Sequence, residues 1–201
     1  MSSENHWRPA TCKAPDLSGL SSNLVVEGIL RLIFHAAESS NPKTRALRYG
    51  YLRLVDKCTY EYRRGRELLM AFVDAERGQR FGILLQSASH FESCVSTMKR
   101  AVSYLDALRR DKDGPSISKN VAVLRNQDRI RRVRDAIEHT DEDILKGNIS
   151  PGDAHVLLVK DDELELGGEK ISYNELAKWI EELHDEAHKI AGHGAANPGA
   201  A

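Results

Sequence analysis

Apolar residues recur at every third or fourth position through most of this chain, and that spacing restricts it to a fold made of packed helices. The first run predicts an amphipathic helix over about residues 20–39. Pro42 is well placed as the first residue of a second helix, which should extend to residue 76. Two further long helices are predicted over about 79–110 and 118–146. Together these runs predict an all-α fold, an antiparallel helical bundle.

Glycine and proline positions predict where the helices end or bend. The loop at residues 111–115 should end the third helix, and Gly147 should end the fourth. Gly50 and Gly65 lie within the second helix, and glycine weakens a helix by about 1 kcal/mol relative to alanine. We therefore expect the second helix to bend or divide at these two positions.

The spacing of apolar residues changes near residue 155. Residues 155–159 favour a strand, and Glu163–Leu166 alternates between charged and apolar side chains. With residues 169–171 they predict a small β-hairpin or three-stranded meander at about 155–171. Ser172 is followed three positions later by Glu175, the spacing of a capping box that opens a last helix ending near residue 191.

The length of 201 residues fits one domain that can bury a core. Residues 1–16 are polar and contain two prolines, so we expect a disordered N-terminal lead. The helical bundle domain should cover residues 17–191, with a disordered tail at 192–201. Apolar residues make up 41% of the chain, which is typical of a globular protein and too many for a disordered one.

Cysteine usage and hydropathy predict a cytoplasmic protein. The three cysteines are scattered and lack metal-ligand spacing, which favours reduced thiols over a disulfide framework. The longest apolar stretch, residues 24–37, is interrupted by charged residues and is too short to span a bilayer. The N-terminus has no apolar core of the kind that a secretory signal needs. We therefore expect no membrane association.

Charge is distributed unevenly, although the net charge is only −1. Between Lys99 and Arg134 there are eleven basic and four acidic residues, a local charge of +7. Between Asp135 and Glu186 there are sixteen acidic residues and four lysines, a local charge of −12. A basic segment of this kind is either a solvated helix face or a track for RNA.

The boundary between these two blocks falls inside a candidate catalytic motif. Arg134 and His139 are separated by four residues, and the polar Asp135 directly follows the arginine. RNA cleaves itself without a metal when a 2′-hydroxyl attacks the adjacent phosphate. A histidine, with an ordinary pKa of ~6.5, can accept or donate the proton, and an arginine can stabilise the charge that develops on phosphate.

The Arg-x-x-x-x-His pattern in the C-terminal half of a long amphipathic helix resembles the motif of the HEPN superfamily. The segment after His139, followed by a hairpin and a capped terminal helix, is similar to the abortive-infection branch of that superfamily. The resemblance covers about residues 20–191. It implies a metal-independent endoribonuclease without a cofactor, of the kind that acts as a toxin or a phage-defence effector. It further implies a homodimer whose motif helices meet in one cleft, and an antitoxin or regulatory partner.

Two positions depart from the usual pattern. Toxins of the HEPN–nucleotidyltransferase pairs carry a tyrosine two residues beyond the histidine, where this chain has Asp141. Neutralisation by tyrosine modification is therefore not supported. The residue after the arginine is often asparagine in the family, and Asp135 is an accepted but less common choice.

Helix geometry adds further candidates around the motif. Residues five apart differ by about 140° around a helix axis, so Arg134 must lean across, or the histidine must come from the partner chain. Glu138 lies four positions after Arg134 and can tether it, while Asp135 and Asp143 each lie four positions from His139. The predicted catalytic residues are Arg134, Asp135, Glu138 and His139.

Upstream of the motif, three arginines form a candidate track for RNA phosphates. Arg125, Arg129 and Arg132 recur at i, i+4 and i+7, so one continuous helix would place them on a single face. These are the predicted RNA-binding residues.

Other interpretations remain open. Arginine and histidine beside several carboxylates can be ordinary surface ion pairs, and a HEPN-like bundle can be a catalytically inactive interaction or RNA-binding module. His184 and His188 lie four apart, but Asp185 replaces the glutamate of the zinc protease motif, so a solvated helix face is favoured. No metal site is predicted.

Overall fold

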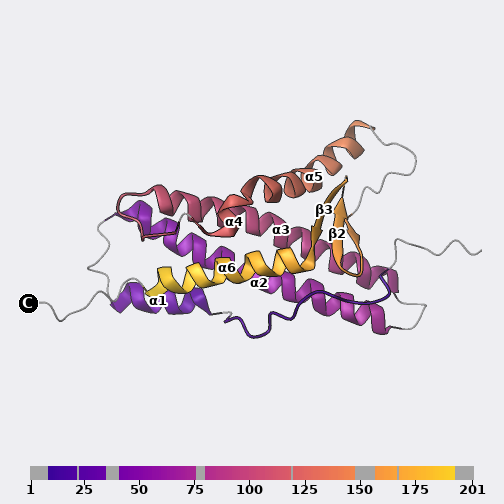
Figure 1. Cartoon of the computed structure of the whole chain (residues 1–201), viewed down its shortest axis with the longest axis horizontal. Coiled ribbons are helices and arrows are strands. Elements are labelled where there is room, and N and C mark those ends of the chain that lie inside the picture. Colours follow the sequence, from indigo (N-terminus) through magenta and orange to yellow (C-terminus); the bar gives the residue numbers. More distant parts are fainter. Residues whose placement is uncertain are drawn as a thin grey trace, which may run out of the picture.

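The protein is a helical bundle with a small three-stranded antiparallel sheet before its last helix, as the sequence predicts (Figure 1). The computed structural model describes residues 9–21, 23–34, 41–75, 80–118, 120–147, 157–166 and 168–192. Its elements are α1 (Leu24–Phe34), α2 (Pro42–Asp74), α3 (Arg80–Arg110), α4 (Ala122–Arg125), α5 (Gln127–Lys146), β1 (Leu158–Val159), β2 (Glu163–Leu166), β3 (Glu169–Ser172) and α6 (Tyr173–Gly192).

The antiparallel pair of α2 and α3 forms the centre of the bundle, and α6 packs beside it (Figure 1). Asn41 caps α2 by accepting a hydrogen bond from the Lys43 N–H at 3.0 Å, and Pro42 is the first helical residue, as predicted. The buried Tyr51 hydroxyl donates to the Leu183 carbonyl at 2.7 Å, which joins α2 to α6. Their shared core is apolar and includes Leu54, Leu69, Phe91, Met98, Leu105, Leu176 and Ile180.

The second helix is not divided at its glycines, because α2 is one helix of 33 residues. Both glycines instead allow α3 to approach closely. A β-carbon at Gly65 would lie 3.2 Å from the buried Phe91 ring, and one at Gly50 would collide with the Tyr104 ring. The missing side chains therefore make room for the aromatic rings of α3.

The predicted single helix over 118–146 is also wrong in its first part. The short α4 ends at Asn126, whose side-chain amide donates to the Ala122 carbonyl at 2.8 Å. Asparagine competes in this way with regular helical bonding. The chain then restarts as α5, which ends before Gly147 at φ +71°, as expected.

The sheet lies against the start of α6 and carries one buried apolar face. Leu164 in β2 pairs with Val159 on one side and Ile171 on the other, and all three are buried. The predicted capping box is confirmed, because the Ser172 hydroxyl lies 2.9 Å from a Glu175 carboxylate oxygen and accepts from the Glu175 N–H. The predicted first strand began at residue 155, but residues 151–156 lie outside the described part.

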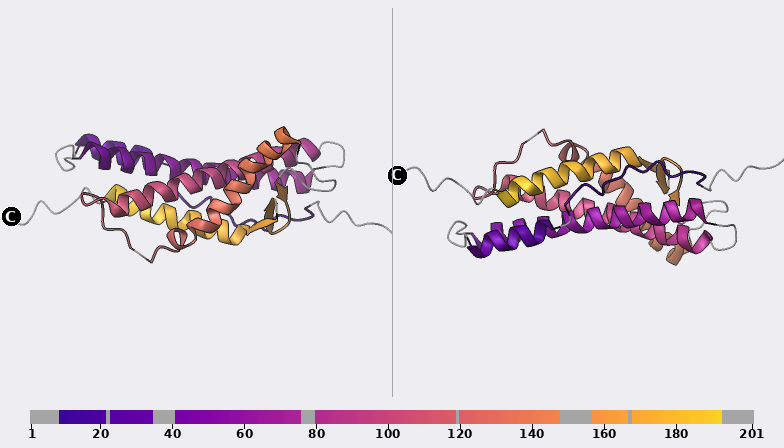
Figure 2. Two further views of the ribbon diagram at one scale, coloured as in Figure 1. Left: turned by 90° about the horizontal axis from the view of Figure 1, so that it is seen from above. Right: turned by 90° about the horizontal axis from the view of Figure 1, so that it is seen from below.

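The expected N-terminal lead needs a correction for residues 9–16, which pack against the bundle with residues 17–21. We call residues 9–21 the strap; it runs between α2 and α6 (Figure 2). Ala14 and Leu17 are buried in the core. Side chains of α2 donate to its carbonyls: Tyr62 to Pro15, Arg66 to Ala14, and Arg63 to Leu17 and Leu20. Residues 1–8 and 193–201 lie outside the described residues.

Asp161 holds the beginning of the strap to the sheet. Its carboxylate accepts the N–H groups of Ala10 at 2.6 Å and Thr11 at 3.0 Å, and its carbonyl accepts that of Lys13. Burial by itself would raise the pKa of Asp161, but the N–H groups of Thr11 and Ala10 outweigh it and lower this pKa below its ordinary value. Sequence patterns missed these contacts because they join residues about 150 positions apart.

The two glycine environments give a matched test of close helix packing. Gly50→Ala should lower the free energy of unfolding by about 1 kcal/mol or more, because overpacking exceeds the gain in helix propensity. A β-carbon at Gly82 in α3 would meet no atom within 4 Å. Gly82→Ala should therefore raise the free energy of unfolding by up to about 1 kcal/mol. Urea denaturation measures both values, and equal stabilisation by the two substitutions would contradict the close approach.

Asp161→Ala should release the strap, whereas Asp162→Ala next to it should not, because the Asp162 side chain is exposed and only its carbonyl bonds to Tyr173. Hydrogen exchange at the Ala10 and Thr11 amides measures the release. In the wild type the pKa of Asp161 is lowered, so its carboxylate stabilises the bound strap fully at any pH above the ordinary carboxyl pKa. This stabilisation is lost as the pH falls through the folded-state pKa. Protection that is unchanged in Asp161→Ala would show that packing alone holds the strap.

Candidate functional site

The motif helix α5 has an anchored first half and an exposed second half. Ile130 and Val133 are buried, and Ile137 is partly buried against the core. The same apolar side of the helix then leaves the bundle, so that Ile144 is 44% and Leu145 87% exposed. Figure 1 shows this end of α5 pointing away from the other helices, and Figure 2 shows α5 crossing the bundle at an angle. The motif lies where the helix leaves the core.

Arg134 is held by two of the predicted catalytic carboxylates. Its guanidinium lies 3.1 Å from Asp135 and forms a second ion pair with Glu138, the predicted i, i+4 tether. About a third of the Arg134 side chain is exposed. Asp135 therefore contacts the arginine, although its i, i+4 spacing from His139 also allowed it to orient the imidazole.

His139 lies on the solvent-exposed part of the same helix. Its side chain is 67% exposed, and Nδ1 lies 3.9 Å from the Glu142 carboxylate. Lys146, 2.9 Å from that carboxylate, lowers the pKa of Glu142 by hydrogen bonding and by its charge, and His139 adds a smaller effect. Glu142 was not among the predicted site residues, although its i+3 spacing from His139 could have indicated it. The side chain of Asp143, the other predicted neighbour, lies outside the described residues.

Within the described part of the chain, no contact joins Arg134 to His139. The 140° between them around the helix axis separates the guanidinium from the imidazole. The structure therefore brings Arg134 together with Asp135 and Glu138, and His139 together with Glu142. One chain therefore presents two separate polar clusters on α5, and each is a candidate half-site.

The predicted track of three arginines is not formed. The interruption at Asn126 places Arg125 on α4, outside the regular spacing of α5, where it is exposed. Arg129 instead forms an ion pair with Glu175, donates to the Lys170 carbonyl at 3.1 Å and lies 6.0 Å from the centre of the Trp179 ring.

Arg132, the third member, is also directed to the sheet, with Nε 3.4 Å from Glu169 in β3. Arg129 and Arg132 therefore connect α5 to β3 and α6. Their partners lie in the acidic C-terminal block, so the two blocks of opposite charge meet in the folded chain.

The two histidines of α6 face inward to different degrees. His184 is buried, with Nε2 2.9 Å from the Ser21 carbonyl of the strap, and its ring lies 4.5 Å from that of the exposed His188. His184 thus fixes the end of the strap, which corrects the expectation of a solvated face. Over the described ranges, no three His, Cys, Asp or Glu side chains are grouped to hold a metal ion.

Comparison of the chain with protein-family models, with curated proteins and with solved structures finds no match. Among the described residues, no helix combines the length and apolar character needed to cross a membrane.

Because Arg129 joins α5 to β3 and α6, we expect this residue to contribute to stability. Arg129→Ala should lower the free energy of unfolding by about 1 kcal/mol or more, because it removes charge-assisted hydrogen bonds that join three elements. Arg125→Ala, the matched control on the exposed side of α4, should change it by less than about 0.5 kcal/mol. Urea denaturation distinguishes them, and similar midpoints for both variants would contradict the structural role of Arg129.

Proposed function

We propose that this chain is a metal-independent endoribonuclease of the HEPN type, which acts as a homodimer. The observation that carries this proposal is the separation of Arg134 and His139 on an exposed helix end. Neither half-site contains both an arginine for the phosphate and a histidine for the proton. Two α5 helices side by side would bring Arg134 of one chain to His139 of the other.

The apolar end of α5 supports a second copy as the neighbour. Ile144 and Leu145 are exposed within two turns of His139, on the part of α5 that leaves the bundle. Exposed apolar side chains that adjoin polar ones are typical of protein–protein contacts. Burying them between two copies would also exclude water from the cleft and strengthen its electrostatic interactions.

The proposed reaction needs only groups of the chain and of RNA. His139 accepts the proton of a 2′-hydroxyl as its oxygen attacks the adjacent phosphorus. The bond to the 5′-oxygen breaks, and the protonated His139 donates the proton that it accepted to the leaving oxygen. Arg134 stabilises the added negative charge through its planar donors. The products are a 2′,3′-cyclic phosphate and a 5′-hydroxyl.

Asp135 and Glu138 act on Arg134 before RNA binds. They orient its guanidinium and neutralise it, so that an RNA phosphate must replace at least one of them. Both ion pairs are partly exposed, and such pairs contribute at most about 1 kcal/mol, so a phosphate can displace them.

A second candidate is a non-catalytic interaction module that uses the same end of α5. The paired state of Arg134 and the exposed Ile144 and Leu145 also fit a surface that binds protein. Under either proposal the compartment is the cytoplasm, and an antitoxin or regulatory partner would cover this surface. The RNase would act as a toxin or phage-defence effector.

Cleavage of RNA in EDTA tests the enzyme, with 2′,3′-cyclic phosphate ends as the expected product. His139→Ala and Arg134→Ala should each lower the rate at least a hundredfold, the usual effect of removing one acid–base or charge-stabilising group. His188→Ala and Arg53→Ala are matched controls on exposed positions outside α5 and should leave the cleavage rate unchanged. Normal cleavage by the His139 variant would contradict the proposed site. A protein that dimerises through α5 without cleaving RNA would favour the interaction module.

Mixing the two inactive variants tests whether the site spans two chains. A symmetric dimer has two equivalent Arg134–His139 pairs across its cleft. In mixed dimers one pair is intact, with Arg134 from the His139→Ala chain and His139 from the Arg134→Ala chain. Random exchange of a symmetric dimer should restore about a quarter of wild-type activity. A mixture that remains inactive, although mass spectrometry shows that mixed dimers form, would place both groups of a site in one chain.

A further inference from the structure

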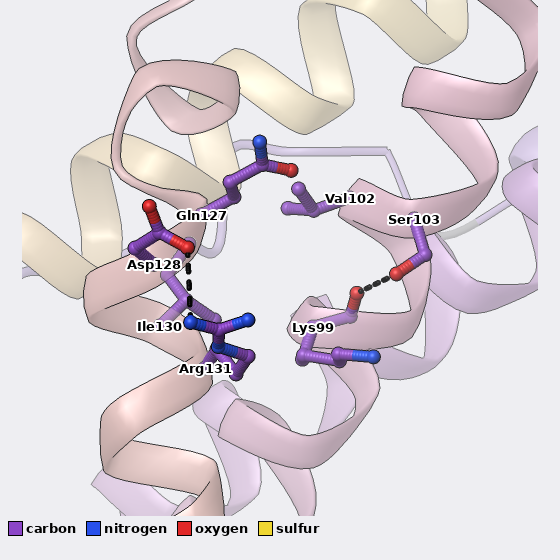
Figure 3. A pocket seen from close by; sticks show the side chains of 7 residues that line it. All are labelled: Lys99, Val102, Ser103, Gln127, Asp128, Ile130 and Arg131. Atoms are coloured by element: carbon purple, nitrogen blue, oxygen red, sulfur yellow. Dashed lines mark hydrogen bonds and ion pairs between the residues drawn. The ribbon is translucent and has the colours of Figure 1, made fainter.

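A hollow of about 250 Å³ lies in the groove between α3 and the beginning of α5. Lys99, Val102 and Ser103 line it from α3, and Gln127, Asp128, Ile130 and Arg131 line it from α5. Figure 3 shows these side chains arranged around an open centre. The buried Val102 and Ile130 contribute apolar surface, while the polar groups belong to the other five residues. None of the seven was a predicted site residue.

The lining has more positive than negative charge. Lys99 is half-buried, and its ammonium forms no ion pair with any side chain of the described residues. Arg131 meets the carboxylate of Asp128 at 3.4 Å, and both side chains are more than half exposed. Such an exposed pair is weak and can be exchanged for a stronger anion. Two cations against one carboxylate favour an anionic ligand.

The neutral polar groups of the hollow add hydrogen-bonding capacity. The Ser103 hydroxyl donates to the Lys99 carbonyl at 3.0 Å and can still accept, and the exposed Gln127 amide offers both donors and an acceptor. A phosphate oxygen can accept from Gln127, Lys99 and Arg131, and a ribose hydroxyl can donate to Ser103 or Gln127. Charge and hydroxyl-binding groups together suit a ribonucleotide unit.

The hollow lies on the same side of α5 as the motif arginine. Gln127, Arg131 and Arg134 recur at i, i+4 and i+7, and Arg131 and Arg134 are separated by about 4.5 Å along the helix axis. This row is continuous within α5. The predicted row of Arg125, Arg129 and Arg132 is interrupted at Asn126, and its last two members connect α5 to α6 and β3. A strand crossing the hollow would therefore continue directly to Arg134.

We infer that the α3–α5 hollow is a subsite for single-stranded RNA, in which Lys99 and Arg131 bind a backbone phosphate next to the phosphate held by Arg134. The inference rests on the proposed RNase function and names the path of its substrate. The hollow replaces the track of arginines that the sequence predicted.

Binding of a fluorescein-labelled, mixed-sequence 12-nucleotide RNA tests the subsite. It is measured by anisotropy in EDTA with full-length His139→Ala protein, so that the RNA stays intact. Lys99→Gln and Arg131→Gln should each weaken binding threefold to tenfold, taking each phosphate contact as a charge-assisted hydrogen bond on a partly exposed surface. Each should also reduce the slope of log affinity against log salt by about 0.7. Arg100→Gln and Arg132→Gln remove the same charge from the neighbouring positions and should have smaller effects on both quantities.

The outcomes separate the subsite from the proposed catalytic activity. Equal effects of the four substitutions would overturn the subsite, even if the wild type cleaves RNA at Arg134 and His139. His139→Ala protein that does not retain the RNA at low salt would also overturn it. Selective loss in Lys99→Gln and Arg131→Gln, without cleavage by the wild type, would support the subsite and reject the RNase. A titration with inorganic phosphate distinguishes an RNA subsite from a site for a free anion. Saturation at low millimolar phosphate, together with no selective loss of RNA binding in Lys99→Gln and Arg131→Gln, would overturn the RNA assignment.

Discussion

The close packing of α2 against α3 is the interaction on which the other elements depend. Gly50 and Gly65 permit it, because an added β-carbon at either position would press on an aromatic ring of α3. The pair provides a long apolar surface that neither helix could bury alone, and α6 covers part of it. The strap and the start of α5 then occupy the remaining grooves. A helix-weakening residue is here a condition of the tertiary structure.

Side chains that bond to distant backbone groups hold the peripheral segments in place. Arg63 and Arg66 donate to carbonyls of the strap, while Asp161 and Asp56 accept the N–H groups at the starts of the strap and of α1. An extended segment or a helix end has backbone groups without partners of its own, and these charged side chains provide them. Burial raises the pKa of Asp56, and the N–H groups of Val25 and Leu24 oppose that effect only in part.

The candidate site depends on the change along α5 from a buried to an exposed helix. Its first half is fixed by Ile130 and Val133 in the core and by Arg129 on α6 and β3. Its second half has an exposed His139 and Leu145. A rigid base with an exposed end can present polar groups to another chain without reorganisation, which is what a site composed of two halves requires. The hollow beside Arg131 lies at the fixed end, where its shape is maintained by the core.

The sequence alone determined the helical class, most helix ends, the capping box and the sheet before α6, because these follow from local periodicity and from the bonding preferences of single residues. It also placed Arg134 and Glu138 within reach of each other, since an i, i+4 pair needs only a helix. Only the tertiary structure decided that Arg129 and Arg132 face acidic residues of β3 and α6, and that Lys99 and Arg131 share a hollow. Ion-pair partners and hollows depend on which elements lie side by side, and long-range packing, which local spacing does not encode, determines that arrangement.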